Sequence, residues 1–201
     1  MARGIASVSA ALFVFSVLLA GPAMAGELRD GASLISGMVG YTSHESQQSG
    51  DQIGGGSWSF DYARVGKGGK WSAGVVMRRM ESDEFFQDEN AGGQEVRVNA
   101  KRLVTAVQGT FFFLDGRFSP YVNGMAGVHM QTSDVYRDGE PDFRQSSQTF
   151  AAGFSGGTHF HVTSGIFLRA EYTFHYFASS DTISKNHMHG FYGGLGFQFG
   201  G

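Results

Sequence analysis

Between residues 34 and 199 the chain repeats one pattern at intervals of about 20 residues: alternating apolar and polar side chains, then a polar connection. The short connections are residues 66–70, 115–117 and 161–164. The segments predicted as long loops are 44–53, 82–94, 134–146 and 178–186. Short turns at one end and long loops at the other are expected of an outer-membrane barrel, but not of a soluble sandwich. The pattern therefore predicts an all-β fold, an eight-stranded antiparallel up-and-down transmembrane β-barrel over residues 31–199.

The first 25 residues have the features of a removable secretion signal. Arg3 is the positive end, residues 5–19 are apolar, and Ala23-Met24-Ala25 forms a small-x-small cleavage site. The apolar stretch is shorter than the roughly 20 residues that span a bilayer, although a retained anchor is the alternative. We therefore expect a secretion signal peptide at residues 1–25 and one outer-membrane β-barrel domain at residues 26–201.

The composition fits an exported barrel and excludes other classes. The formal net charge of −3 becomes about −4 without Arg3, which argues against nucleic acid as a partner. The chain has no cysteine, so it has no disulfide or cysteine-based metal framework. Mean hydropathy is slightly negative at −0.15, although 19 residues are Phe. Strands that are apolar on one side only produce this near-neutral average.

Strict period-two alternation divides the predicted strands into two faces. In residues 166–176, Ile166, Leu168 and Tyr172 share one face, while Arg169 and Glu171 share the other. The apolar face is broad and aromatic, and the second face mixes Gly and Ser with charges of both signs. An eight-stranded barrel has an interior that side chains just fill, so the charged face is predicted to line the lumen. A soluble, lipocalin-like barrel is the alternative.

Aromatic residues gather at two heights along the predicted strands, as the girdles of outer-membrane barrels do. With the N-terminus in the periplasm, the inner girdle comprises Tyr62, Trp71, Phe113, Phe118, Phe160 and Phe199. The outer girdle comprises Tyr41, Phe150 and Tyr176.

Three segments resemble the small outer-membrane β-barrel superfamily. Residues 118–127 (FSPYVNGMAG) are similar to its strand-five signature, residues 168–172 (LRAEY) to its strand-seven signature, and residues 193–199 (GGLGFQF) to its closing strand. The chain resembles the membrane domain of OmpA and the Opa-type proteins. The resemblance implies the outer membrane of a Gram-negative bacterium and insertion by the barrel-assembly machinery. It specifies a fold and no activity. One departure is that Gly200-Gly201 follow Phe199, where such chains usually end on an aromatic residue.

Charged and titratable residues on the inward face form the first candidate site, which is predicted to be a lumen charge network: Asp61, Arg78, Arg102, Arg169, Glu171 and His175. His129 and His159 face inward by the same parity. Buried charges must pair or stay hydrated, because desolvation costs several kcal/mol per ion. One interpretation is a network that plugs the lumen. The other is a gate, in which the arginines exchange acidic partners and admit a small-ion path.

Enzymatic and metal-binding hypotheses receive less support, so we expect no catalytic residue, no metal and no cofactor. Some outer-membrane barrels of this size deacylate lipid A with a His and a Ser two positions apart, but here Phe177 follows His175 at that spacing. The pairs His159/His161 and His187/His189 each supply two nitrogens, which alone bind a metal weakly. The acid-rich residues 81–95 follow no known calcium-loop spacing and are predicted to be a mobile surface loop.

A second candidate site lies on the outward face, above the predicted lipid-facing band. Arg79, Arg97 and Lys101 are predicted to meet the phosphates of lipopolysaccharide, since arginine suits bidentate phosphate contact. Solvated charge is the alternative. The expected partners are therefore outer-membrane lipid and lipopolysaccharide, with an unidentified surface ligand. The leading hypothesis is a non-enzymatic barrel with a structural or surface-interaction role; a narrow gated channel and a lipid A-modifying enzyme are the alternatives.

Overall fold

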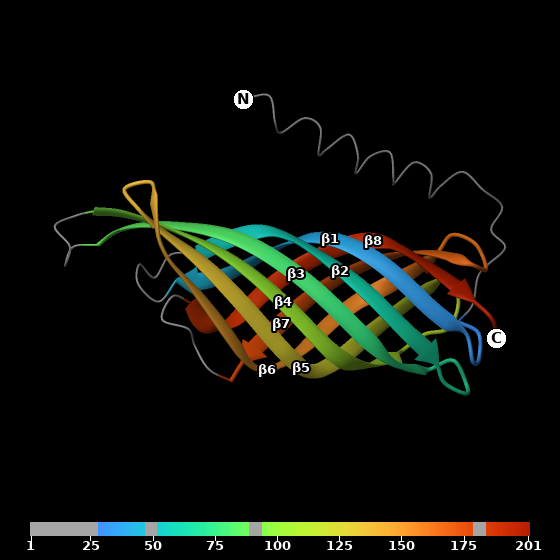
Figure 1. Cartoon of the computed structure of the whole chain (residues 1–201). Coiled ribbons are helices and arrows are strands. Elements are labelled where there is room, and N and C mark those ends of the chain that lie inside the picture. Colours follow the sequence, from blue (N-terminus) through green and yellow to red (C-terminus); the bar gives the residue numbers. More distant parts are fainter. Residues whose placement is uncertain (1–27, 47–51, 89–93, 179–183) are drawn as a thin grey trace, which may run out of the picture.

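The computed structural model describes residues 28–46, 52–88, 94–178 and 184–201, and these form one closed β-barrel (Figure 1). The strands are β1 (Ser33–Ser46), β2 (Gln52–Val65), β3 (Trp71–Asp88), β4 (Gln94–Phe112), β5 (Phe118–Arg137), β6 (Glu140–His161), β7 (Ile166–Phe177) and β8 (Ser184–Phe199). Each strand pairs antiparallel with its sequence neighbours, and β1 pairs with β8 to close the barrel. The predicted fold class is confirmed. The predicted signal peptide lies outside the described residues.

The described residues contain no helix long and apolar enough to cross a membrane.

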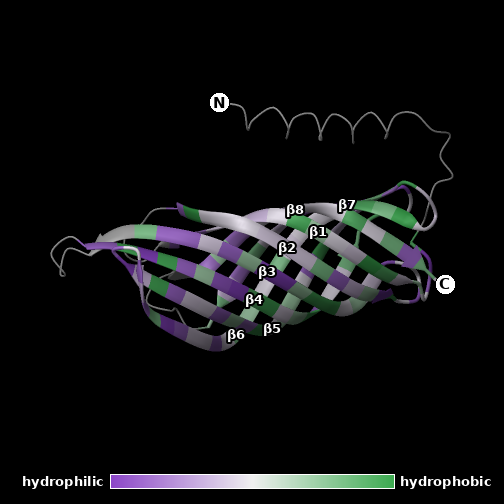
Figure 2. Ribbon diagram, turned by 45° about the horizontal axis from the view of Figure 1, so that its top comes forward, coloured by the Kyte–Doolittle hydropathy of each residue, from purple (hydrophilic) through white to green (hydrophobic). Residues whose placement is uncertain are grey.

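The outer surface carries the apolar half of the alternation. Val39, Val107 and Phe191 are each more than 60% exposed, although burial of such side chains normally stabilises a fold. The aromatic residues assigned to both girdles also face outward. Figure 2 shows hydrophilic residues concentrated along β3, β4 and β6 at the end opposite the C-terminus. An exposed apolar surface this extensive is typical of a protein that another apolar phase covers.

Two segments predicted as long loops are strands, and that part of the prediction is wrong. Residues 82–88 continue β3 and pair with residues 94–100 of β4. In the next hairpin the two-residue turn Asp138-Gly139 joins β5 to β6. Both turn residues have positive φ, 48° and 85°, the geometry that two-residue hairpins favour. Exposure differs between the two segments: in the first hairpin and at the end of β5 the inward side chains Glu84, Val98 and Val135 are buried, whereas residues 140–146 are exposed on both faces.

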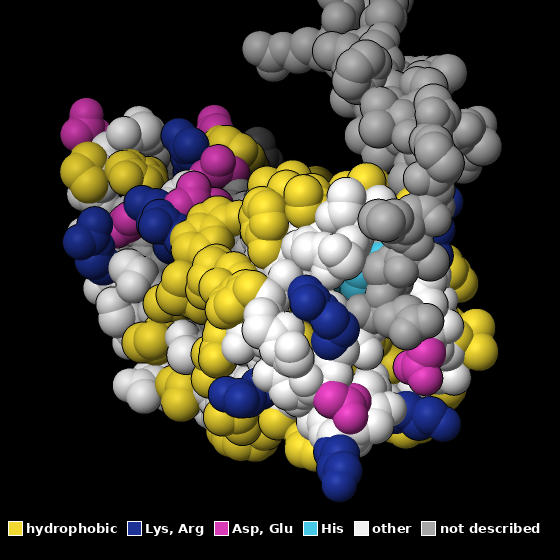
Figure 3. Space-filling view, turned by 90° about the vertical axis from the view of Figure 1, so that its right-hand side faces the viewer, with side chains coloured by type: hydrophobic (Ala, Val, Ile, Leu, Met, Phe, Trp, Pro, Cys, Tyr) yellow, Lys and Arg dark blue, Asp and Glu magenta, His cyan; other side chains and the backbone are white. Residues whose placement is uncertain are grey.

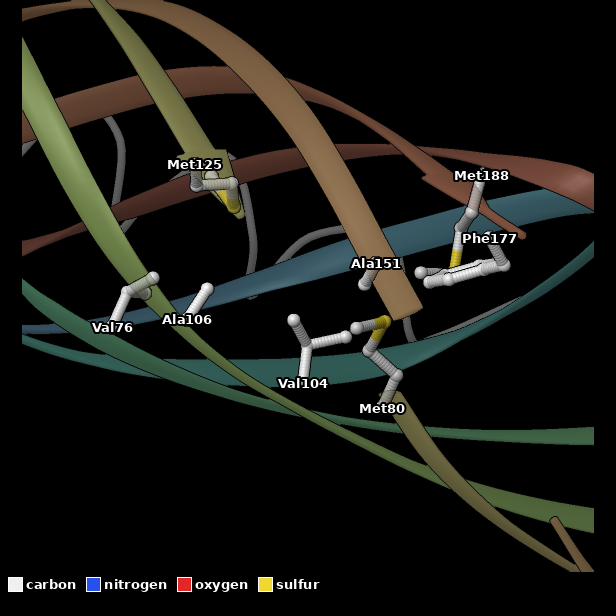
Figure 4. Close-up of a cluster of buried hydrophobic side chains, with 8 residues drawn as sticks. All are labelled: Val76, Met80, Val104, Ala106, Met125, Ala151, Phe177 and Met188. Carbon is white, nitrogen blue, oxygen red and sulfur yellow. The ribbon is translucent and has the colours of Figure 1, made fainter. Parts of the chain in front are cut away.

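The lumen is filled in layers. At the end with the tight turns, an apolar cluster comprises Leu28, Ala32, Leu34, Val65, Phe112, Tyr121 and Phe167. Toward the opposite end a second apolar cluster comprises Val76, Met80, Val104, Ala106, Met125, Ala151, Phe177 and Met188 (Figure 4). Charged side chains from β2, β3 and β7 lie inside the barrel as well, as their strand parity predicts.

Candidate functional site

Glu171 of β7 is the centre of the lumen charge network. Its side chain is fully buried, and its two oxygens form ion pairs with the guanidinium groups of Arg78 and Arg169. The Tyr121 hydroxyl donates a third hydrogen bond to Glu171 Oε2, at 2.5 Å. One carboxylate therefore serves two buried arginines, which come from strands on different sides of the barrel.

Arg169 is held by a larger set of acceptors than Arg78. It lies 3.3 Å from Asp61 Oδ1, donates to the Ser36 hydroxyl at 3.0 Å, and donates to the Tyr121 hydroxyl at 2.7 Å. Asp61 in turn accepts hydrogen bonds from Ser59 at 2.8 Å and from the Gln108 amide at 3.2 Å. If either Glu171 or Asp61 is replaced, Arg169 therefore still has the other carboxylate as a partner.

Arg78 has fewer partners. Besides Glu171, its Nη1 lies 3.2 Å from His175 Nε2, and its guanidinium stacks over the Tyr192 ring at 5.0 Å. Arg78 Nε has no hydrogen-bond partner within the described part of the chain. Arg78 depends on Glu171 for its counter-charge, which makes this pair the sensitive point of the network.

Arg102, the sixth charged or titratable residue of the predicted set, lies in a separate group. Arg102 donates to Gln131 Oε1 at 2.8 Å and to the Ser82 hydroxyl at 3.3 Å, and its guanidinium lies 3.3 Å from each ring nitrogen of His44, one of which can accept a hydrogen bond. The structure therefore brings Asp61, Arg78, Arg169, Glu171 and His175 together and places Arg102 apart from them.

The predicted network did not include Tyr121, although the alternation of β5 places this side chain on the inward face. A long polar side chain on that face, level with the charges of β7, was a sequence signal that it could join the network. Gln108 and Asn123 were missed in the same way. Asn123 donates to Gln108 at 2.9 Å and so extends the network to β4 and β5.

Little free volume remains around these side chains. A cavity of about 20 Å³ lies between the network and the apolar cluster at the tight-turn end, with Asp61, Arg169 and His159 in its lining. That volume suits a single water molecule.

The histidine pairs lie in different environments. His159 and His161 are buried in the lumen, and His159 stacks on Phe167 with ring centroids 4.4 Å apart. His187 and His189 lie on the outward face, where the Tyr172 hydroxyl is 2.5 Å from His189 Nδ1. No group of three His, Cys, Asp or Glu residues among the described residues is arranged to hold a metal ion.

The second candidate site, Arg79, Arg97 and Lys101, faces outward, and each side chain is about half exposed. Each also lies beside a carboxylate. Arg79 pairs with Glu81 at 2.6 Å, Arg97 with Asp83 at 3.3 Å and Lys101 with Asp134 at 3.9 Å. The three cations are therefore partly neutralised within the protein.

Beyond the apolar band, the outer parts of β3, β4, β5 and β6 form a protruding sheet. β2 pairs with β3 only as far as Met80, and β7 pairs with β6 only from Ala151 onward. Residues 140–149 of β6 pair with β5 on one side, and no described strand pairs with the other side. Nearly all of these residues are exposed. This segment is called the β6 edge below.

The backbone groups that point out from the β6 edge can be identified. Ala178 N donates to Phe150 O at 3.0 Å, so the main-chain groups of Phe150 point away from β5. Because strand geometry repeats every two residues, those of Gln148, Ser146 and Arg144 point the same way. Within the described ranges these groups have no strand partner, and a row of N–H and C=O groups left without one forms a template for another extended chain.

Comparisons with known proteins agree on the fold. No protein-family model and no curated protein matches the sequence. Neisserial surface protein A aligns with a TM-score of 0.60 at 14% identity, over 85% of this chain and all of that one. A major outer membrane protein of Thermus thermophilus has a TM-score of 0.60 at 9% identity, over 84% and 99% of the two chains. Ail of Yersinia pestis has a TM-score of 0.54 at 14% identity, over 85% and 100%. The chain thus has the fold of the small eight-stranded outer-membrane barrels, as the sequence resemblance predicted.

Proposed function

We propose that the protein is an integral outer-membrane barrel of a Gram-negative bacterium that acts in surface interaction. The exposed aromatic belt supports membrane insertion, because water would disfavour it strongly. The lumen serves as a closed, structural plug. The observation that carries the surface role is the protruding sheet, which places the β6 edge outside the apolar band with no partner strand among the described residues on its outer side.

The β6 edge favours an extended polypeptide as the ligand. Strand addition to a free edge gains affinity from main-chain hydrogen bonds, and Ser146 and Gln148 supply groups of the required direction. Ail has been solved with the heparin analogue sucrose octasulfate. Here the outward arginines and Lys101 already have carboxylate partners, which disfavours a polysulfated ligand.

The test compares cells that display two variants of the protein. Ser146→Pro removes one edge N–H and is expected to lower adhesion to a casein-coated surface about fivefold, the value of one hydrogen bond. Ser146→Ala keeps the N–H and should adhere like the wild type. Equal adhesion of Ser146→Pro and wild type, or preferential adhesion to heparin, would contradict the proposal. Slower migration of boiled than unboiled protein from the outer-membrane fraction tests membrane insertion separately.

Contact with lipopolysaccharide remains part of the proposal. Replacing Arg79, Arg97 and Lys101 together by Gln should weaken co-purification with lipopolysaccharide, and more strongly at low salt, where exposed charges are less screened. The ion pairs to Glu81, Asp83 and Asp134 limit the expected effect. Equal retention of lipopolysaccharide at low ionic strength would show that these cations are ordinary solvated charges.

The alternative functions have weaker support. A channel requires Arg78 and Arg169 to leave Glu171, and steady single-channel current in planar bilayers that changes in Arg169→Ala would support it. For the lipid A deacylase hypothesis, His175 would need access to lipid, yet its ring is fully buried in the lumen beside Arg78. Loss of a lipid A acyl chain on overexpression, abolished by His175→Ala, would revive that hypothesis.

A further inference from the structure

The lipid-facing surface of β3, β4 and β5 contains a hollow. Its floor is a transverse row of small residues, Ala73, Gly109 and Gly124, which are direct neighbours across the three strands. Larger side chains form its walls: Trp71, Phe111, Val122, Val107 and Phe154. The two adjoining parts of the hollow are shallow and open on their outer side, with volumes of about 550 and about 600 Å³.

Packing within the protein does not account for the two floor glycines. A Cβ atom added to Gly109 or Gly124 would meet nothing within 4 Å, and neither residue has a positive φ. By contrast, a Cβ on Gly74 or Gly127 would lie about 2 Å from a backbone oxygen of the neighbouring strand. Glycine weakens a strand, and Gly37 shows that an outward glycine with open space can stand elsewhere on the barrel. What distinguishes the hollow is three small residues in one row between large apolar walls, which leaves space that a molecule outside the barrel can occupy.

The rim of the barrel next to this hollow is cationic. Arg64, Lys67, Lys70 and Arg117 lie in or beside the tight turns, and none of them forms an ion pair within the described part of the chain. On the protruding sheet the opposite holds, because each cation described there has a carboxylate partner. Figure 3 shows this end, where dark-blue side chains stand in front of the yellow apolar belt.

Two rim cations are well placed beside the hollow. Lys70 precedes Trp71, and its carbonyl accepts a hydrogen bond from Phe112 N at 2.8 Å. Arg117 stacks over the outward ring of Phe160 at 4.8 Å, and its Nε has no hydrogen-bond partner in the described part of the protein. The Asp115 and Asp30 carboxylates lie at the same turn, both within 4 Å of a Cβ built on Gly69, but within the described part of the chain neither forms an ion pair with Lys70 or Arg117.

We propose that this hollow and the cations at its rim bind one anionic phospholipid of the inner leaflet. An acyl chain lies on the Ala73–Gly109–Gly124 floor, and the headgroup phosphate lies against Lys70 and Arg117. Aromatic walls suit a hydrocarbon chain, and unpaired cations at the water interface suit a phosphate. This inference rests on the proposed membrane insertion, which also gives the hollow its lipid neighbours.

The experiment uses the two tryptophans of the chain as reporters. Trp71 lines the hollow, whereas Trp58 lies on β2, paired with Arg79 near the protruding sheet. In the Trp58→Phe background, the folded protein is placed in phosphatidylcholine vesicles that contain a small amount of one acyl-brominated lipid. One sample contains brominated phosphatidylglycerol and the other contains the same mole fraction of brominated phosphatidylethanolamine. We expect brominated phosphatidylglycerol to quench Trp71 more strongly. Trp58, measured in the Trp71→Phe background, should show no preference.

Variants separate the two parts of the site. Lys70→Gln and Arg117→Gln should each lower the preference for phosphatidylglycerol about fivefold at low salt, the equivalent of about 1 kcal/mol per interfacial cation. Gly109→Leu should fill the hollow and abolish selective quenching by either lipid. Gly37→Leu is the matched control, because Gly37 of β1 is also outward with open space around its Cβ position.

Equal quenching of Trp71 by both lipids would overturn the proposal, as would an unchanged preference in Gly109→Leu. A change from dimer to monomer in that variant, detected by crosslinking, would assign the hollow to a second copy of the chain instead. Failure of the wild type to insert into vesicles as a heat-modifiable barrel would refute the proposed membrane function itself, an outcome distinct from lost lipid preference.

Discussion

Replacing Glu171 by Gln should be among the most destabilising single changes in the lumen. The substitution keeps the shape of the side chain but removes the carboxylate that pairs with Arg78 and Arg169. Breaking a buried ion pair by removing one partner typically costs 3–5 kcal/mol. Arg169 keeps Asp61 at 3.3 Å, so most of the cost should come from Arg78, which has no second carboxylate among the described residues. We therefore expect a loss of about 3–5 kcal/mol in the free energy of unfolding.

A second variant tests this reasoning. Arg78→Met combined with Glu171→Gln removes both buried charges of the sensitive pair, so the double variant should be more stable than Glu171→Gln alone. Urea unfolding of the barrel in lipid vesicles, followed by tryptophan fluorescence and by the shift on unboiled gels, measures both changes. A cost below about 1 kcal/mol for Glu171→Gln, or a double variant less stable than the single one, would refute the account of the network.

Three further outcomes follow from local geometry. Gly139→Val should lower the free energy of opening the β5–β6 hairpin tip by about 1–3 kcal/mol, because φ at Gly139 is 85° and valine is strained there. Faster amide hydrogen exchange at the tip would detect this change. The hydrogen bond from Arg144 holds the pKa of the Asp134 carboxyl below its ordinary value of 3.8, so this contact persists above that pH and is lost as pH falls through the lowered pKa. Carboxyl carbon-13 titration should show the pKa rising in Arg144→Gln. Gly127→Val should prevent folding, since its Cβ would lie 2.1 Å from the Thr105 carbonyl oxygen, whereas Gly109→Val should fold normally on unboiled gels.

Strand alternation made the fold and the facing of most side chains predictable from sequence. In β7 the alternation is unbroken, so one inward assignment placed Arg169, Glu171 and His175 together on the lumen side. The protruding sheet was not predictable in the same way. Segments such as 140–150 are polar on both faces, because water lies on both sides, and period two then leaves no hydrophobic signal. In this segment the Asp138-Gly139 dipeptide was the one sequence feature that indicated a tight hairpin turn in place of a long loop.

The pairing of the lumen charges could not be derived from parity alone. Parity states that a side chain points inward, but its partner depends on strand tilt and on which strands face each other across the barrel. Arg78 and Glu171 are 93 residues apart in sequence and on non-adjacent strands, yet they form an ion pair. Arg102, with the same parity, instead joins His44 and Gln131.

The abundance of glycine has a spatial explanation that connects the closed lumen with the outward hollow. On the inner wall, a Cβ on Gly157 would lie 2.6 Å from the Tyr121 hydroxyl, and a Cβ on Gly196 would lie 2.1 Å from the Phe167 ring. These glycines let large side chains cross the narrow lumen, and side chains of the described residues fill it. Gly109 and Gly124 have no such side chain above them. The same residue type therefore makes room for large side chains inside the barrel, whereas on the outside the row of Ala73, Gly109 and Gly124 leaves the space in which we propose that a lipid chain lies.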